Sequence, residues 1–185
     1  LNIGTMLKVA LKNEVEATDL AAAWLPSTRE IDVKLGFARQ VGDESKHYQQ
    51  IAHRCRELGV DLSGFDPLAE GYSPLYKHLV TLTDTVERVA AGQFTREAIA
   101  LVKNEAFISY CEEQGDAETA RLYRDTIQPD ERFHHELGRK LLERYAVGDA
   151  AQERARRASR RVLELAEELT ALARAKKGLH HAPGC

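Results

Sequence analysis

The chain of 185 residues is long enough for one domain with a full hydrophobic core. Its 43% hydrophobic and 30% charged residues are ordinary for a globular protein, and its net charge of −3 gives no indication of a nucleic-acid or membrane binder. No apolar run approaches the roughly 20 residues of a membrane span, and no leader peptide opens the chain, so we expect a non-membrane, cytoplasmic protein.

The cysteines support the same compartment. Their number is odd, and none forms a Cys-x-x-Cys pair, which fits a reducing cytoplasm better than a disulfide framework. The absence of such pairs also excludes a rubredoxin-type iron module. The cysteines are Cys55, Cys111 and Cys185.

The first half of the chain contains long helical patterns and no convincing strand alternation. A first helix is predicted at about 3–25. Ser27 and Glu30 then form the capping box of a second helix, which Gly59 ends. The stretch 60–73 is rich in Gly, Pro, Asp and Ser and is predicted to be a loop.

In the second half, a proline suited to a first helical turn opens a helix at about 74–91, and Gly92 breaks it. The next helix runs from about 95 to 114. The segment 116–146 is predicted to be helical with a break or kink at Pro129.

A last helix follows at about 150–176, and the composition of the tail 177–185 predicts that it is loosely held. The pattern predicts an all-α fold. The natural core is a four-helix bundle within residues 1–148, with an extra helix at 74–91 in the central connection and a C-terminal amphipathic helix at 149–176.

Two short motifs carry the chemistry. The stretches "DESKH" at 43–47 and "DERFH" at 130–134 are both Asp-Glu-x-x-His. In each, the Glu and the His stand three residues apart and share one helix face, which is the apolar face. The candidate residues are therefore Glu44, His47, Glu131 and His134.

A repeated triplet adds one glutamate to each motif. Lys-Asn-Glu occurs at 12–14 and again at 103–105, each time inside a predicted apolar helix. Glu14 precedes the first motif, and Glu105 the second, at comparable distances. The chain therefore reads as two copies of one unit, in which a helix with an inward Glu precedes a helix with an inward Glu-x-x-His.

Four inward glutamates cannot remain unpaired in a core, because isolated buried carboxylates are costly or become protonated. Two divalent cations would offset their charge. Carboxylate and imidazole together favour iron or manganese over calcium or structural zinc. The alternative is a set of surface charges at coincidental helical spacing.

Over roughly residues 3–146 the sequence resembles the ferritin-like di-iron carboxylate superfamily, which places Glu from two helices and Glu-x-x-His from two others around two metals. The resemblance implies two iron ions, with manganese as the alternative. It implies that Glu14, Glu44 and His47 hold one metal and that Glu105, Glu131 and His134 hold the other. Glu44 and Glu131 would bridge the two ions.

The same resemblance gives a role to the aspartates that open the motifs. In related oxygenases this Asp accepts the second N–H of the histidine across the bundle. We therefore expect Asp43 to pair with His134 and Asp130 with His47. The alternative is that both are solvated helix residues.

Three other residues are assigned ordinary roles. His135 points about 100° away from His134 and is expected near the site or at the surface rather than as a ligand. Tyr48 could be a redox tyrosine, but a core role is favoured. Cys111 is expected to pack in the core.

Three functions are compatible with the resemblance: an oxidase or hydroxylase of an organic substrate, a ferroxidase or iron-handling protein, and a peroxidase of rubrerythrin type. Bacterioferritin has a haem-binding methionine where this chain has Ser45, so no haem is expected. Rubrerythrin has a further Glu where this chain has Ile108. These differences favour the oxygen-activating enzyme, which would require an organic substrate and an electron donor or reductase.

The last helix has an apolar seam surrounded by arginines. We expect the seam to form a homodimer contact, although it could also lie against its own bundle. The arginines could hold RNA phosphates, but pairing with nearby acids is favoured, so no nucleic-acid partner is expected. The seam consists of Ala155, Ala158, Val162, Leu165, Leu169 and Leu172.

Overall fold

The protein is all-helical, as the sequence predicts. A computed structural model describes residues 2–177 and 182–184, and these residues contain no strand. The helices are α1 (Ile3–Trp24), α2 (Ile31–Glu57), α3 (Pro74–Leu79), α4 (Thr85–Val89), the π-helix η1 (Ala90–Arg96), α5 (Glu97–Glu113), α6 (Ala117–Leu122), the π-helix η2 (Tyr123–Ile127), α7 (Gln128–Tyr145) and α8 (Asp149–Lys177).

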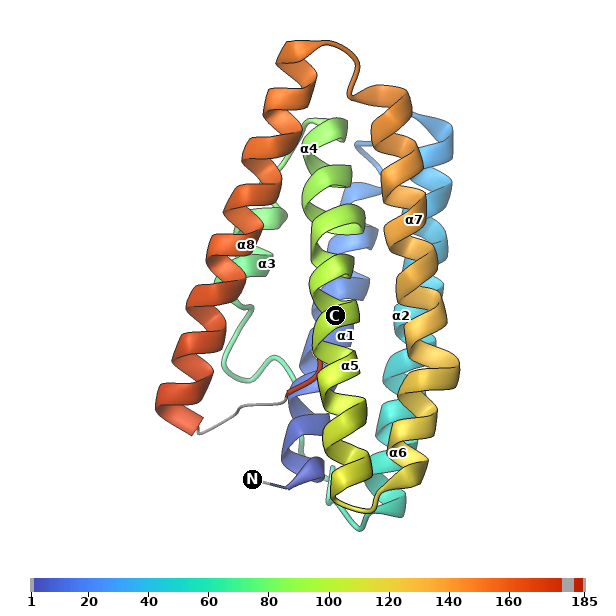
Figure 1. The fold of residues 1–185 in the computed structure, drawn as a ribbon, viewed down its shortest axis with the longest axis vertical. Helices are drawn as coiled ribbons and strands as arrows, with labels where there is room; N and C mark the ends of the chain where they lie inside the picture. The colour runs from blue at the N-terminus through green and yellow to red at the C-terminus, as the bar shows by residue number, and fades with distance from the viewer. Residues whose placement is uncertain (1, 178–181, 185) are drawn as a thin grey trace.

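The long helices run along a common direction (Figure 1). α1 packs along α2, α5 packs along α7, and α2 also contacts α7. α1 and α7 run one way, whereas α2 and α5 run the opposite way. The connection at 58–84 therefore crosses the length of the molecule, and α8 lies outside the other long helices.

The start of α2 differs from the predicted capping box. The helix begins at Ile31, and its N-cap residue Glu30 makes no side-chain cap hydrogen bond. Ser27 Oγ instead accepts a hydrogen bond from Arg88 (2.8 Å), and Glu30 accepts one from Thr85 (2.7 Å). Tertiary contacts to α4 have replaced the local cap.

The third long helix begins earlier than predicted. α3 ends at Leu79, Asp84 caps a new helix, and α4, η1 and α5 then continue without a break. Gly92 lies inside this helix, where a Cβ atom would come within 2.8 Å of the Trp24 ring. The glycine permits close packing against α1 rather than ending a helix, so the extra helix of the connection is only α3.

Pro129 does not break the following helix either. It lies in the first turn of α7, directly after the π-helical segment η2, and the chain stays helical from Ala117 to Tyr145. A π turn has a wider hydrogen-bonding pattern, which accommodates a residue that lacks an N–H group.

The interior consists of two apolar clusters. One contains Leu7, Ile51 and Phe107, together with the free cysteines Cys55 and Cys111. The other contains residues from the opposite ends of the same helices, including Trp24, Phe37 and Leu141. On each helix, the predicted polar site residues fall between the two sets. Cys185 lies outside the described residues.

The seam of α8 is covered by its own chain. Ala158, Val162 and Leu165 are buried against the neighbouring helices, and only Leu172, near the far end, is exposed. The seam therefore gives no support to the expected homodimer contact. Four arginines of α8 pair with acids, as favoured from sequence: Arg154 with Asp84, Arg156 with Glu153, Arg157 with Glu87, and Arg161 with Glu164.

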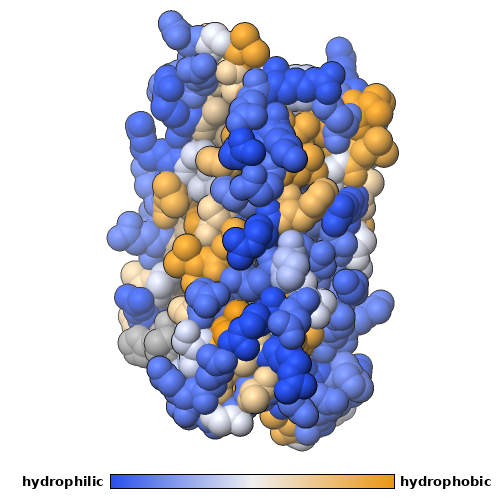
Figure 2. All heavy atoms as spheres, turned by 45° about the vertical axis from the view of Figure 1, so that its right-hand side comes forward, coloured by the Kyte–Doolittle hydropathy of each residue, from blue (hydrophilic) through white to orange (hydrophobic). Residues whose placement is uncertain are grey.

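Figure 2 shows one side of the molecule as mostly hydrophilic, with apolar residues in separate patches. Among the described residues, no helix combines the length and the hydropathy needed to cross a bilayer.

Part of the predicted tail is ordered against the helices, because Pro183 is buried.

Candidate metal centre

The two Glu-x-x-His motifs meet in the interior. α2 supplies Glu44 and His47, and α7 supplies Glu131 and His134, all four with 0% of their surface exposed. Their spacing of three places each pair on the inward face of its helix. The direct contacts between α2 and α7 bring the two pairs together.

Each histidine is held by an aspartate from the opposite helix. Nε2 of His47 lies 3.1 Å from Asp130, and Nε2 of His134 lies 3.0 Å from Asp43. Both predicted pairings are therefore present in the structure. An aspartate that accepts the Nε2 proton leaves Nδ1 as the free lone pair, and in both histidines Nδ1 faces the glutamates.

Glu44 and Glu131 both span the two histidines. Oε2 of Glu44 lies 3.1 Å from His47 Nδ1, while its Oε1 lies 3.7 Å from His134 Nδ1. Oε1 of Glu131 lies 3.8 Å from His47 Nδ1, and its Oε2 lies 3.6 Å from His134 Nδ1. Each carboxylate thus directs one oxygen toward each histidine.

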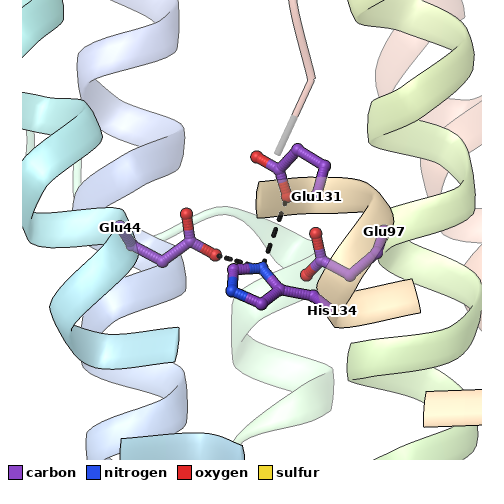
Figure 3. A group of neighbouring side chains, drawn as sticks. All are labelled: Glu44, Glu97, Glu131 and His134. Atoms are coloured by element: carbon purple, nitrogen blue, oxygen red, sulfur yellow. Dashed lines mark ion pairs between the residues drawn. The ribbon is translucent and has the colours of Figure 1, made fainter. Parts of the chain in front are cut away.

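Two further glutamates complete the cluster. Glu14 of α1 lies beside His47, with Oε2 3.6 Å from Nδ1. Glu97, the first residue of α5, joins Glu44, Glu131 and His134 (Figure 3). Ligand atoms within 4.8 Å of one another form two groups, one of Glu44, Glu97, Glu131 and His134 and one of Glu14, Glu44 and His47.

The prediction that Glu105 joins the site was wrong, because its side chain is exposed. The inward face of α5 carries Glu97, Ala100, Asn104 and Phe107, and Glu105 follows directly after a member of that face. In the second copy of the repeated triplet it is therefore the asparagine, Asn104, that is buried. Counting in helical steps from Glu97 would have placed Asn104 on the buried face and Glu105 off it. Because the helix was predicted to begin near residue 95, Glu97 was instead taken as part of the helix start.

Gln40 was missed by the sequence analysis. Its buried amide donates hydrogen bonds to Oε1 of Glu97 (2.7 Å) and to Oε1 of Glu44 (3.1 Å). It lies one turn before Glu44 on α2, so its spacing within the inward stripe was a usable signal. This amide fixes two of the carboxylates relative to each other.

In the metal-free protein, three of the carboxylates bind protons unusually tightly. Burial, reinforced by the charge of Glu44, raises the pKa of Glu14 to about 7 and that of Glu131 to about 8. Burial and the charge of Glu131 raise the pKa of Glu97 well above its ordinary value. Protons then provide the positive charge that so many buried carboxylates require.

Glu44 and His47 form a charged pair within the cluster. Against the effect of burial, a hydrogen bond with His47 and the charges of the two histidines lower the pKa of Glu44 to about 2. The buried cation Arg96 adds to this effect. Interactions with Glu14 and Glu44 raise the pKa of His47 to about 12, although burial opposes this shift.

Several atoms that face the cluster have no hydrogen-bond partner within the described chain. They are Oε2 of Glu14, Oε2 of Glu97, both oxygens of Glu131 and Nδ1 of His134. Leaving such groups buried and unsatisfied is costly, and bound cations would satisfy them. Carboxylate oxygens and imidazole nitrogens are donors that suit iron or manganese. The residues present therefore fit a pair of such ions.

The three residues that the sequence did not assign to the metal site, His135, Tyr48 and Cys111, lie outside the cluster. His135 Nδ1 contacts the carbonyl oxygen of Phe94 (2.8 Å), and its ring stacks on the Phe94 ring. Tyr48 is partly buried against an apolar cluster, and Cys111 lies within that cluster.

Comparisons with protein families, with curated proteins and with solved structures found no match.

Proposed function

We propose that the chain is a di-metal carboxylate protein with a ferritin-like four-helix bundle formed by α1, α2, α5 and α7. In this proposal it binds two iron ions, or two manganese ions, and activates dioxygen to oxidise or hydroxylate an organic substrate.

The observation that carries the proposal is that the carboxylates of Glu44 and Glu131 each lie between the two histidines. Each places one oxygen near Nδ1 of His47 and the other near Nδ1 of His134. A carboxylate shared in this way is suited to bridge two cations, whereas a site for a single ion would need no such sharing.

The other groups then take complementary roles. Glu14 would complete the ligands of the ion beside His47, and Glu97 those of the ion beside His134. Asp43 and Asp130 would retain the Nε2 protons and keep each ring in its orientation. Gln40 would limit the movement of Glu44 and Glu97.

Iron held by the glutamates and histidines of the cluster would supply electrons to dioxygen, so the proposed reaction would also require an external electron donor. The protein contributes burial, because the side chains of the cluster are almost fully shielded from solvent. Exclusion of water strengthens the electrostatic interactions within the site and protects reactive species.

The test is a titration of the metal-free protein with Fe(II) under anaerobic conditions, followed by exposure to oxygen with a reductant. We expect uptake to stop at two irons per chain. With a substrate present, oxygen should be consumed repeatedly. A ferric deposit far beyond two irons per chain would instead identify an iron-handling protein, and absence of tight binding would contradict the metal assignment.

A further inference from the structure

A cavity lies beside the proposed metal centre, on the outer side of α1 and α5. It has a volume of about 440 Å³ and is enclosed by α1, α5, α8 and residues 182–184. This size falls in the range of pockets that bind small organic molecules. Most of its lining is apolar and includes Val9, Leu75, Ile99, Ala106, Leu169 and Ala173.

Residues 182–184 form a fixed wall of this cavity. Asn13 Nδ2 donates a hydrogen bond to the carbonyl oxygen of Pro183 (3.2 Å), and the N–H of Gly184 donates one to Asn104 Oδ1 (3.1 Å). The two asparagines are the central residues of the repeated Lys-Asn-Glu triplets. The repeat thus has a structural role, because it attaches one segment to two helices.

The charge of the cavity is unbalanced. Besides Arg96, whose charge acts on Glu44, the lining contains two cations, Lys103 and Arg174, and a single carboxylate among the residues that the structure describes. That carboxylate, Glu16, already accepts hydrogen bonds from the N–H (2.7 Å) and the hydroxyl (2.6 Å) of Ser73.

Lys103 is the cation whose charge most clearly lacks compensation. Within the described part of the chain, no carboxylate lies within 4.0 Å of the terminal nitrogens of Lys103 or Arg174. Burial and the charge of Arg174 accordingly lower the pKa of Lys103. An anionic group on a ligand would offset this excess of positive charge.

The cavity and the metal centre share a wall. Asn13 directly precedes Glu14, and Arg96 directly precedes Glu97. Consecutive helical residues point about 100° apart, so each helix presents one side chain to the cluster and the next toward the cavity. Arg96 lines the cavity and also lowers the pKa of Glu44 through its charge. A molecule bound here would lie next to the proposed metals.

We propose that this cavity binds an organic carboxylate with an apolar body, with the carboxylate at Lys103 and Arg174 and the body between Ile99 and Leu169. Its assignment as the substrate of the oxygen chemistry rests on the proposed function. The binding itself does not, because none of these residues belongs to the metal cluster.

Binding can be measured by calorimetry on the full chain, with decanoate as the probe and 1-decanol as its uncharged control. We expect decanoate to bind more tightly than 1-decanol. Lys103→Gln should lower the affinity for decanoate by about tenfold and leave the affinity for 1-decanol unchanged, since one charge-assisted contact is lost. Lys140→Gln, at an exposed lysine outside the cavity, is the matched control and should change neither.

A second pair of variants tests the location. Ala173→Phe fills the cavity from α8 and should weaken both probes, whereas Ala171→Phe on the exposed side of the same helix should not. Equal affinity for both probes, or equal effects of Lys103→Gln and Lys140→Gln, would overturn the inference.

Iron stoichiometry, measured on the same samples, separates this inference from the proposed function. Binding of iron without decanoate would refute only the cavity assignment. Binding of decanoate without iron would support the carboxylate site and refute the metal centre, and with it the role of the ligand as a substrate.

Discussion

Glu97 and Glu105 lie on the same helix, yet only Glu97 reaches the cluster. Eight residues at about 100° each leave them about 80° apart around the helix axis, which is enough to move one side chain from the interior to the solvent. Residue type and a repeated triplet were therefore weaker guides than the angular position relative to Ala100 and Phe107.

This difference predicts opposite results for two matched variants. Glu97→Gln removes a buried carboxylate oxygen from the cluster and should abolish tight binding of one of the two irons. Glu105→Gln, on the exposed side of α5, should leave two irons per chain. The measurement is iron content after anaerobic loading and desalting. Loss of iron in the Glu105 variant with retention in the Glu97 variant would reverse the assignment.

The aspartates carry a separate prediction. Asp43→Ala or Asp130→Ala should weaken metal binding by roughly 10- to 100-fold, because the opposite histidine loses the acceptor that orients its ring. Competition with a chelator gives the affinity. An unchanged affinity in both variants would mean that the aspartates do not act on the histidines.

The sequence predicted most of the site because helical spacing determines which residues share a face. A spacing of three within an amphipathic helix was enough to predict that Glu44 lies beside His47 and that Glu131 lies beside His134. To predict that Glu97 and Gln40 belong to the site, one would need to know where the helices begin and how each is rotated relative to its neighbours. Gly92 suggested a break close to Glu97, and only packing against Trp24 explains why the helix continues.

At the scale of the elements, close helix contacts depend on particular glycines. The third long helix passes so near α7 that a Cβ on Gly138 would lie 2.8 Å from backbone atoms of Gln93 and Phe94. Backbone atoms cannot move aside as a flexible side chain can. Both residues belong to η1, the π-helical segment that directly precedes Glu97.

Gly138→Ala should therefore lower the free energy of unfolding by about 1–3 kcal/mol. Gly42→Ala is the matched control, because it is also helical but has no atom within 4 Å of the added Cβ. It should raise the free energy of unfolding by roughly 0.5–1 kcal/mol. Urea unfolding measures both changes, and a Gly138 variant as stable as the parent would show that the two helices can separate at little cost.

For the whole molecule, the buried cluster of glutamates and histidines, which lies between the two apolar clusters, makes stability depend on pH. An unfolded chain releases the protons of Glu14 and Glu131 near the ordinary value of 4.5, whereas the folded protein holds them until about pH 7 and 8. Within that window the folded state binds more protons, so the free energy of unfolding falls as pH rises. The raised pKa of His47 acts in the same direction above 6.5.

We therefore expect the Tm of the metal-free protein to fall as the pH rises from 4.5 to about 8. Bound metal should reverse the trend, because its binding requires deprotonated ligands and is stronger at higher pH. Calorimetry of both forms in matched buffers tests this. A metal-free Tm that rises across the window would contradict the protonated cluster.

The crossed pairing of aspartates and histidines also constrains the order of folding events. Asp43 of α2 orients His134 of α7, and Asp130 of α7 orients His47 of α2, so the acceptor for each histidine's Nε2 proton comes from the other helix. Tight metal capture then has to follow the docking of α2 on α7. In stopped-flow refolding of the metal-free chain with Co(II), the visible absorption of the bound ion should appear at a rate that does not depend on Co(II) concentration. A rate that increases in proportion to Co(II) would mean that a single helix captures the ion before docking.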